Sequence, residues 1–171
     1  ITPSGGWIPT VIAGNTGVGL SQRAQSFVLN EDENPYNVIE PGKRPRSTLT
    51  PAMAIKDGKP FISFAVQGGD TQDQNLLQFF LNMVEFDMNV QEAAEAPNMN
   101  SYQMYSSFGS HSKEVGRIVV QEDTPPWVKK DLRKMGYNVV TRHLTSGPIN
   151  AIWFDRKHGT MWGGSSNHGE D

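Results

Sequence analysis

The chain has 171 residues, a formal net charge of −3 and no cysteine. The lack of cysteine excludes disulfides, thiolate nucleophiles and cysteine-based metal sites from this chain. A slightly acidic balance argues against a dedicated nucleic-acid binder, and no apolar run reaches the roughly 18 residues that a membrane span needs. We therefore expect one globular domain, residues 1–171, without a nucleic-acid partner and without membrane insertion.

The first fifty residues are rich in glycine, serine, proline and asparagine. Two short runs, residues 7–12 and 17–20, are candidate strands. Prolines at 35, 41 and 45 favour an ordered surface loop over residues 30–47. The glycines at 14, 17 and 19 do not follow the G-x-G-x-x-G order of dinucleotide-binding proteins, so they predict a turn and no cofactor site.

From residue 52 onward the sequence pattern predicts individual strands and helices. Apolar runs at 52–56 and 60–66 flank Asp57 and Gly58, a pair that favours the type I′ turn of a β-hairpin. The second run leads into Gln67-Gly68-Gly69, and a helix should follow, capped by Asp70 or Thr71. Apolar residues at 76, 80 and 84, widened by 77 and 81, give this helix its buried stripe, and it should end near residue 87.

A second, shorter helix is expected after Asn89, with Glu92 as the capping-box partner and Pro97 as the stop. Residues 101–110 should be extended and 115–120 a strand. Thr124 is expected to cap a helix at 127–135 that Gly136 terminates. Strands at 137–142, 149–154 and 160–163 complete an α+β pattern, with helices packed on an antiparallel sheet.

Two short groups of residues are candidates for a binding or catalytic site. Ser47 and Thr48 follow Arg44 and Arg46, and hydroxyl and guanidinium groups suit a carboxylate ligand; an ordinary polar turn is the alternative. Gly68 and Gly69 precede a helix N-terminus, where backbone N–H groups can bind an anion or form an oxyanion hole; close packing of strand and helix is the alternative.

The histidines do not indicate a metal site. There are four, at 111, 143, 158 and 168, and none has the i, i+4 spacing of a zinc-binding helix. His168 lies near Glu170 and Asp171, but a solvated tail is the expected reading of that segment. We expect neither a metal nor a cofactor.

Four stretches, in order, carry a resemblance to a known family: PGKRPRSTLTPAMAIKDGKP, FAVQGGDTQ, LLQFFLNMVEFDMNVQEAAEAPNM and MWGGSSNHGED. They are similar to the small subunit of γ-glutamyltransferases, which are N-terminal-nucleophile hydrolases. The resemblance implies an αββα sandwich, half of it contributed by this chain and the rest by a large subunit from the same precursor. Family substrates are glutathione and related γ-glutamyl amides, and the compartment stays open between periplasmic or secreted and cytoplasmic.

The resemblance also implies a mechanism. A zymogen cleaves itself and frees an N-terminal threonine, whose hydroxyl attacks an amide carbonyl with its own α-amino group as base. Water or an acceptor amine then takes the acyl group. Gly68 and Gly69 match the family's oxyanion hole, and Ser47 and Thr48 match the paired serines that hold the substrate α-carboxylate. No threonine of this chain matches the nucleophile, which is expected upstream of Ile1, so this chain alone should be inert.

Two departures from the family pattern bear on the substrate. Arg23 and Ser26 stand where the family has a glutamine and an aspartate that bind the substrate α-amino group, and Gln67 replaces a proline. An arginine facing an ammonium group would cost on the order of a few kcal/mol. These changes favour the branch of glutaryl and cephalosporin acylases as an alternative substrate class. A degenerate, non-catalytic family member is the third alternative.

Overall fold

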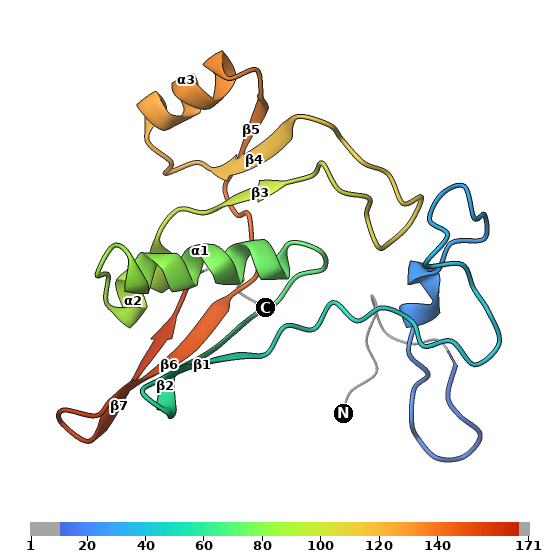
Figure 1. Cartoon of the computed structure of the whole chain (residues 1–171), viewed down its shortest axis with the longest axis horizontal. Coiled ribbons are helices and arrows are strands. Elements are labelled where there is room, and N and C mark those ends of the chain that lie inside the picture. The colour runs from blue at the N-terminus through green and yellow to red at the C-terminus, as the bar shows by residue number, and fades with distance from the viewer. Residues whose placement is uncertain (1–10, 168–171) are drawn as a thin grey trace. The chain divides into compact units, whose positions relative to one another are not determined.

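A computed structural model describes residues 11–167. The chain divides into two compact units, one within residues 1–48 and 105–112 and the other within 49–104 and 113–171. We call them the N-terminal unit and the core unit (Figure 1). The expectation of a single domain over residues 1–171 stays a prediction.

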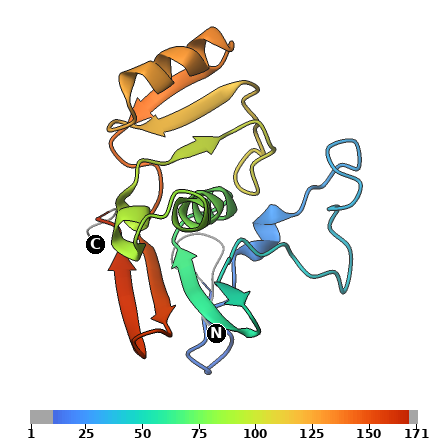
Figure 2. The same cartoon turned by 60° about the vertical axis from the view of Figure 1, so that its left-hand side comes forward.

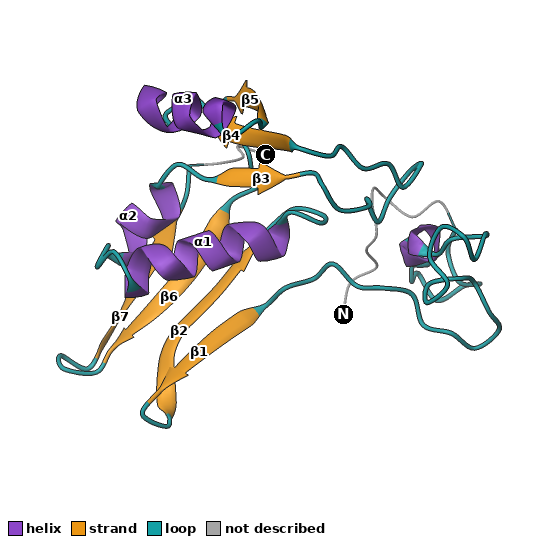
Figure 3. Cartoon of the chain, turned by 45° about the horizontal axis from the view of Figure 1, so that its top comes forward, coloured by secondary structure: helices purple, strands orange, loops and turns teal. Residues whose placement is uncertain are grey.

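A four-stranded antiparallel sheet forms the base of the core unit. Its order is β1-β2-β6-β7, with β1 at Ala52–Lys56, β2 at Lys59–Val66, β6 at Ile149–Asp155 and β7 at Thr160–Ser165. Helices α1 (Gln72–Val84) and α2 (Val90–Glu95) cover one face of this sheet (Figures 2 and 3). The hydrophobic core lies between them and comprises Ile62, Val66, Leu76, Phe79, Val90, Ala93, Ala94, Ile149 and Ala151.

The hairpin β1–β2 forms as its turn residues predict. Asp57 has φ 53° and Gly58 has φ 72°, the two positive values that a type I′ turn requires. Lys56 then pairs with Lys59 directly across the turn. The two expected helices are also confirmed, although α1 ends three residues before the predicted end near residue 87.

Helix α1 buries a different stripe from the predicted one. Leu76 and Phe79 are buried, whereas Leu77 is 59% exposed and Val84 38% exposed. The apolar residues extend further around the helix than the sheet covers, so their period alone does not fix which edge faces inward. Thr71 is the N-cap residue but makes no side-chain capping hydrogen bond.

Helix α2 carries the expected capping box. The Asn89 side chain accepts hydrogen bonds from the N–H groups of Gln91 and Glu92, and the Glu92 carboxylate accepts one from the Asn89 N–H. We expect Asn89→Ala to lower the free energy of unfolding by about 1 kcal/mol, because the first turn loses its acceptor. Urea unfolding of both proteins measures the difference. Asn89→Asp keeps the acceptor and should match the unsubstituted protein, whereas equal stability of the alanine variant would refute the role of the cap.

A second sheet has the order β3-β4-β5, with β3 at Met99–Ser101, β4 at Arg117–Gln121 and β5 at Asn138–Arg142. Strands β4 and β5 pair in parallel through a crossover that contains α3 (Pro126–Lys134). The prediction of a single antiparallel sheet is therefore wrong here, because a strand, a helix and a strand in succession return the chain parallel to itself. Gly136 ends α3 with φ 94° as predicted, but Pro125 occupies the N-cap position expected for Thr124.

The N-terminal unit contains turns and one short 3₁₀ helix, η1 (Arg23–Ser26), within its described part. The predicted strand at 17–20 is wrong. Only an isolated bridge joins Ile12 to Gly19, because the left-handed Gly14 and Gly17 turn the chain too early for a ladder. Most of the other candidate strand, 7–12, lies outside the described residues. The predicted loop at 30–47 is confirmed as free of helices and strands.

The sheet face opposite α1 and α2 carries apolar side chains. Met53 pairs with Ser63, which pairs with Ile152, so these three residues share one face. Met53 is 55% exposed, Ile152 46% and Ile55 58%. A sheet with helices on one face and an apolar second face is half of a layered α+β fold. No helix within residues 11–167 is both long and apolar enough to cross a membrane.

Candidate functional site

The double-glycine loop joins β2 to α1 in the core unit. Gly68 has φ +147°, a conformation that L side chains rarely adopt. A Cβ at this position would also stand 3.1 Å from Thr71 Oγ1. The Gly69 carbonyl accepts the Gln72 N–H at 3.4 Å, which begins the first turn of α1. Position 68 is therefore specific for glycine on both conformational and steric grounds.

The first turn of α1 is also held from the segment that enters β1. Thr50 Oγ1 donates to Gln72 Oε1 over 2.9 Å, and Gln72 is buried. An apolar hollow of about 320 Å³ opens beside this contact, lined by Thr50, Pro51, Ala52, Phe64, Asp73, Leu76, Leu77 and Phe80. The helix N-terminus supplies a partial positive charge at the same end, so the double-glycine loop lies where backbone N–H groups and the helix dipole favour an anion.

Arg23 and Thr48 come together in the N-terminal unit although 25 residues separate them. Arg23 Nη1 donates to Thr48 Oγ1 over 2.5 Å, and Arg23 is only 8% exposed. Ser47, the neighbour of Thr48, is exposed. The guanidinium thus contacts the Thr48 hydroxyl, and guanidinium and hydroxyl groups are the combination expected for binding a carboxylate.

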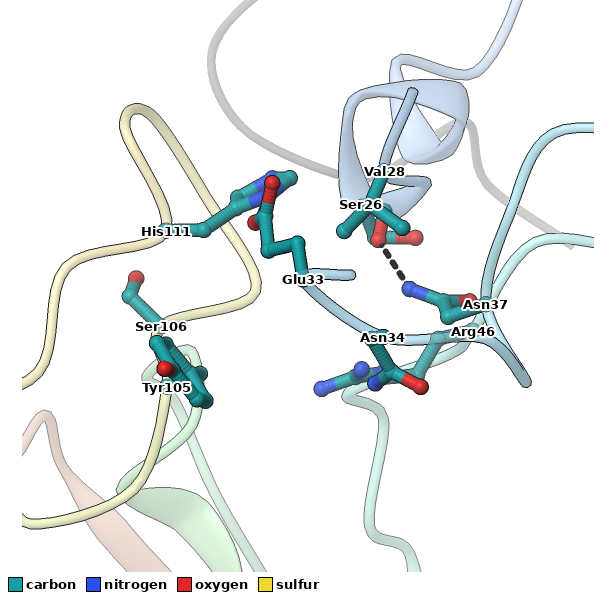
Figure 4. Close-up of a pocket in the computed structure, with 9 residues that line it drawn as sticks. All are labelled: Ser26, Val28, Glu33, Asn34, Asn37, Arg46, Tyr105, Ser106 and His111. Atoms are coloured by element: carbon teal, nitrogen blue, oxygen red, sulfur yellow. Dashed lines mark hydrogen bonds and ion pairs between the residues drawn. The ribbon is translucent and has the colours of Figure 1, made fainter. Parts of the chain in front are cut away.

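Ser26 is buried in the same unit and serves the local backbone. Its hydroxyl donates to the Arg23 carbonyl over 2.8 Å. Its own carbonyl accepts the Asn37 side-chain amide at 2.5 Å (Figure 4). These two contacts close η1 and hold Arg23 where it meets Thr48. The substrate-binding role expected for Ser26 stays a prediction.

His111 ties the segment 105–112 to the start of the chain. One ring nitrogen contacts Glu33 Oε1 at 2.7 Å, and the other contacts the Gln25 carbonyl at 3.0 Å. Both contacts raise the pKa of His111, and the hydrogen bond to the Gln25 carbonyl is the largest single cause. Close by lies a cavity of about 20 Å³ that Glu33, Arg46 and Tyr105 help to line (Figure 4). A space of this size holds about one water molecule and not an acyl group.

We expect His111 to stabilise the protein most at acidic pH. Because the folded pKa lies above the unfolded value of about 6.5, its contribution is complete below that value and is lost as the pH rises through the folded pKa. Urea unfolding of the unsubstituted protein and of His111→Gln should therefore differ more at about pH 5.5 than at about pH 8. Glu33→Gln should lower the pKa of His111 in an NMR titration. A stability difference that grows with pH would contradict this assignment.

The predicted site residues thus fall into two groups. Gly68, Gly69 and Gln67 lie in the core unit, and Arg23, Ser26, Ser47 and Thr48 lie in the N-terminal unit. Within residues 11–167, no cluster of three histidine or acidic residues could hold a metal ion. The segment of His168, for which a solvated tail is predicted, lies outside the described residues. Sequence reasoning missed His111, whose partners are 78 and 86 residues away in the chain.

The family model described as Gamma-glutamyltranspeptidase matches residues 9–171. A glutathione hydrolase-like proenzyme, YwrD, of Bacillus subtilis is 42% identical over 87 residues, which are 51% of this chain and 16% of that protein. The chain also covers 24% of a glutathione hydrolase proenzyme of the same organism at 28% identity. It therefore spans less than a quarter of the length of these curated relatives.

Solved structures agree with the sequence matches. A mutant gamma-glutamyltranspeptidase of Helicobacter pylori superimposes with a TM-score of 0.74 at 25% identity, covering 92% of this chain and 84% of that one. A cephalosporin acylase of Bacillus halodurans also gives a TM-score of 0.74, at 27% identity, over 89% of this chain and 26% of that one. The α+β fold of N-terminal-nucleophile hydrolases is confirmed.

Proposed function

Because the chain belongs to the γ-glutamyltranspeptidase family, we propose that it is part of an amide hydrolase or acyltransferase that works through an acyl-enzyme. The acyl group is carried by an N-terminal threonine that self-cleavage of a precursor exposes. The observation that carries this proposal is the Gly68–Gly69 loop, with Gly68 at φ +147° at the start of α1. That loop offers backbone N–H groups where the tetrahedral oxyanion develops.

The residues have distinct roles in this reaction. The N–H groups of Gly68 and Gly69 stabilise negative charge that exists only in the transition state and intermediate, so they raise kcat more than they lower KM. Ser47 and Thr48 hold the carboxylate of the acyl group by hydrogen bonds. The Arg23 contact with Thr48 adds a positive charge to that carboxylate site. Gln67 is the residue directly before the two glycines of this loop.

The partner in this proposal is a large subunit cut from the same precursor. Both Bacillus subtilis relatives are described as proenzymes. The apolar sheet face with Met53, Ile55 and Ile152 supplies a surface on which a second sheet would pack, as the two central layers of the sandwich require. The acceptor of the acyl group is water or an amine.

The complete protein, incubated with γ-glutamyl and glutaryl nitroanilides, tests the proposal. We expect release of nitroaniline from at least one of them after self-cleavage. Self-cleavage without hydrolysis of either anilide would contradict the proposal. An uncleaved and inactive protein would instead favour a non-catalytic family member that acts by binding.

One observation favours a second candidate, a glutaryl or cephalosporin acylase. Arg23 carries a positive charge and is buried against Thr48, at a position where the resemblance implies an uncharged glutamine that helps to bind the substrate α-amino group. A glutaryl group has the same carboxylate and lacks the ammonium, so it avoids repulsion from Arg23. The similarity to the Bacillus halodurans acylase supports this candidate as well. Relative hydrolysis of the two anilides distinguishes the two functions.

A further inference from the structure

The loop between β5 and β6 contacts the double-glycine loop at Gln67. The Gly147 N–H donates to the Gln67 carbonyl oxygen over 3.2 Å. A Cβ atom at position 147 would stand 2.7 Å from that oxygen and 2.8 Å from Gln67 Cβ. The φ of Gly147 lies outside the left-handed region. Glycine is therefore required at 147 by the close approach of two backbones and not by an unusual conformation.

Residues 145–147, which we call the clamp loop, are anchored by two buried asparagines. The Asn100 side-chain amide donates to the Thr145 carbonyl, and the Thr145 hydroxyl donates to Asn98 Oδ1. Asn98 Nδ2 in turn donates to Ser146 Oγ over 3.2 Å. Asn98 is 4% exposed and Asn100 is fully buried. Thr145 and Ser146 are therefore hydrogen-bonded to the asparagines in β3 and just before it, and Gly147 is hydrogen-bonded to Gln67.

Strand β3 is itself fixed to α1 by two glutamine side chains. Gln74 exchanges both amide hydrogen bonds with the Ser101 backbone, at 3.2 and 2.7 Å. Gln78 does the same with the Met99 backbone, at 2.8 and 2.9 Å. These side chains satisfy the free edge of β3 as a neighbouring strand would. The contacts thus run from α1 through β3 and the clamp loop to Gln67, so both ends of the double-glycine loop are held by one network.

The Gln67 carbonyl and the Gly68 N–H belong to the same planar peptide unit. A hydrogen bond that fixes the carbonyl therefore fixes the direction of the N–H on the opposite side. We propose that the clamp loop is a positioning element that orients the Gly68 N–H, and through it the Gly68–Gly69 oxyanion hole. This inference rests on the proposed function of that hole. Gly147 acts through Gln67 and touches no substrate in this account.

Two glycine-to-alanine variants of the complete protein separate positioning from simple damage to the fold. Gly147→Ala forces Gln67 away and rotates the Gln67–Gly68 peptide. We expect kcat for the preferred anilide to fall about 10- to 100-fold, with KM within about twofold of its original value. Gly164→Ala brings a Cβ equally close, 2.7 Å, to the Val90 carbonyl, which lies in α2. It should lower the unfolding temperature with kcat retained.

Thr145 offers a milder test in case Gly147→Ala does not fold. Thr145→Val removes the hydroxyl that donates to Asn98 and keeps the shape, so kcat should fall several-fold, by less than with Gly147→Ala. Thr145→Ser restores the hydroxyl and should restore kcat. Hydrogen exchange of a peptide spanning residues 64–72 gives a readout that does not depend on turnover. Exchange there should be faster in Gly147→Ala than in Gly164→Ala.

The outcomes distinguish the inference from the proposed function. An unsubstituted protein that hydrolyses neither anilide overturns the proposed function and this inference with it. An active protein in which Gly147→Ala keeps its kcat overturns the inference alone. The inference is also overturned if kcat falls in both Gly147→Ala and Gly164→Ala in proportion to their loss of stability. Destabilisation of the fold then explains the loss of activity at both positions. A fall in kcat specific to Gly147→Ala, with serine rescue at 145, supports it.

Discussion

Gly68→Ala should lower kcat of the complete protein by about 100- to 1000-fold, the range found when one donor of an oxyanion hole is lost. The alanine meets a φ of +147° and a Cβ contact of 3.1 Å with Thr71 Oγ1. Relief of that strain turns the peptide and moves the Gly68 N–H. KM should change little, because the N–H groups bind the oxyanion and not the ground-state carbonyl. Steady-state kinetics with the preferred anilide measure both parameters.

Gly164→Ala is the control for Gly68→Ala. Its added Cβ stands 2.7 Å from the Val90 carbonyl, so it disturbs packing against α2 and not the double-glycine loop. It should leave kcat unchanged. If Gly68→Ala folds with the stability of the control and retains its kcat, the oxyanion role of this loop is wrong.

Arg23→Asp should shift substrate preference towards the γ-glutamyl anilide by about tenfold or more, measured as the ratio of kcat/KM for the γ-glutamyl and glutaryl substrates. The change replaces a positive charge by a negative one beside Thr48, and an aspartate attracts the α-amino group that glutaryl lacks. At a separation of about 4 Å near a protein surface such a reversal is worth a few kcal/mol before screening by solvent.

Arg23→Gln separates charge from hydrogen bonding. It removes the positive charge and can still donate to Thr48 Oγ1, so it should give an intermediate ratio. Because Arg23 is 8% exposed, the unfolding temperature of each variant must accompany its kinetics. An unchanged ratio in a stable Arg23→Asp protein would show that this loop does not contact the acyl group.

Local signals in the sequence were sufficient for part of the fold. Asp57-Gly58, the Asn89–Glu92 box and Gly136 each specify backbone geometry within a few residues, and the structure confirms all three. The parallel pairing of β4 and β5 was missed because period and turn chemistry describe elements and not which strands meet. Similarly, the inward face of α1 depends on how much of the helix the sheet covers.

The candidate site likewise contains some residues that local sequence signals identify and others that depend on long-range contacts. The double glycine is visible in sequence because it stands between an apolar run and an amphipathic helical pattern. The contact of Gly147 with Gln67 joins residues 80 positions apart, and Gly147 has no unusual φ that a turn motif would mark. The clamp loop and the glutamine pairs on β3 are long-range hydrogen bonds between common polar residues. Such partners become apparent only when the chain is folded.

Intact-mass analysis of the complete protein during turnover of the preferred anilide tests directly whether an acyl-enzyme forms. We expect two fragments from one precursor. The fragment that contains this chain should begin with threonine and carry a transient mass increase equal to the acyl group, and that acyl adduct should accumulate more slowly in Gly68→Ala. An uncut precursor, or anilide hydrolysis without any acyl adduct on this fragment, would contradict an acyl-enzyme stabilised by Gly68 and Gly69.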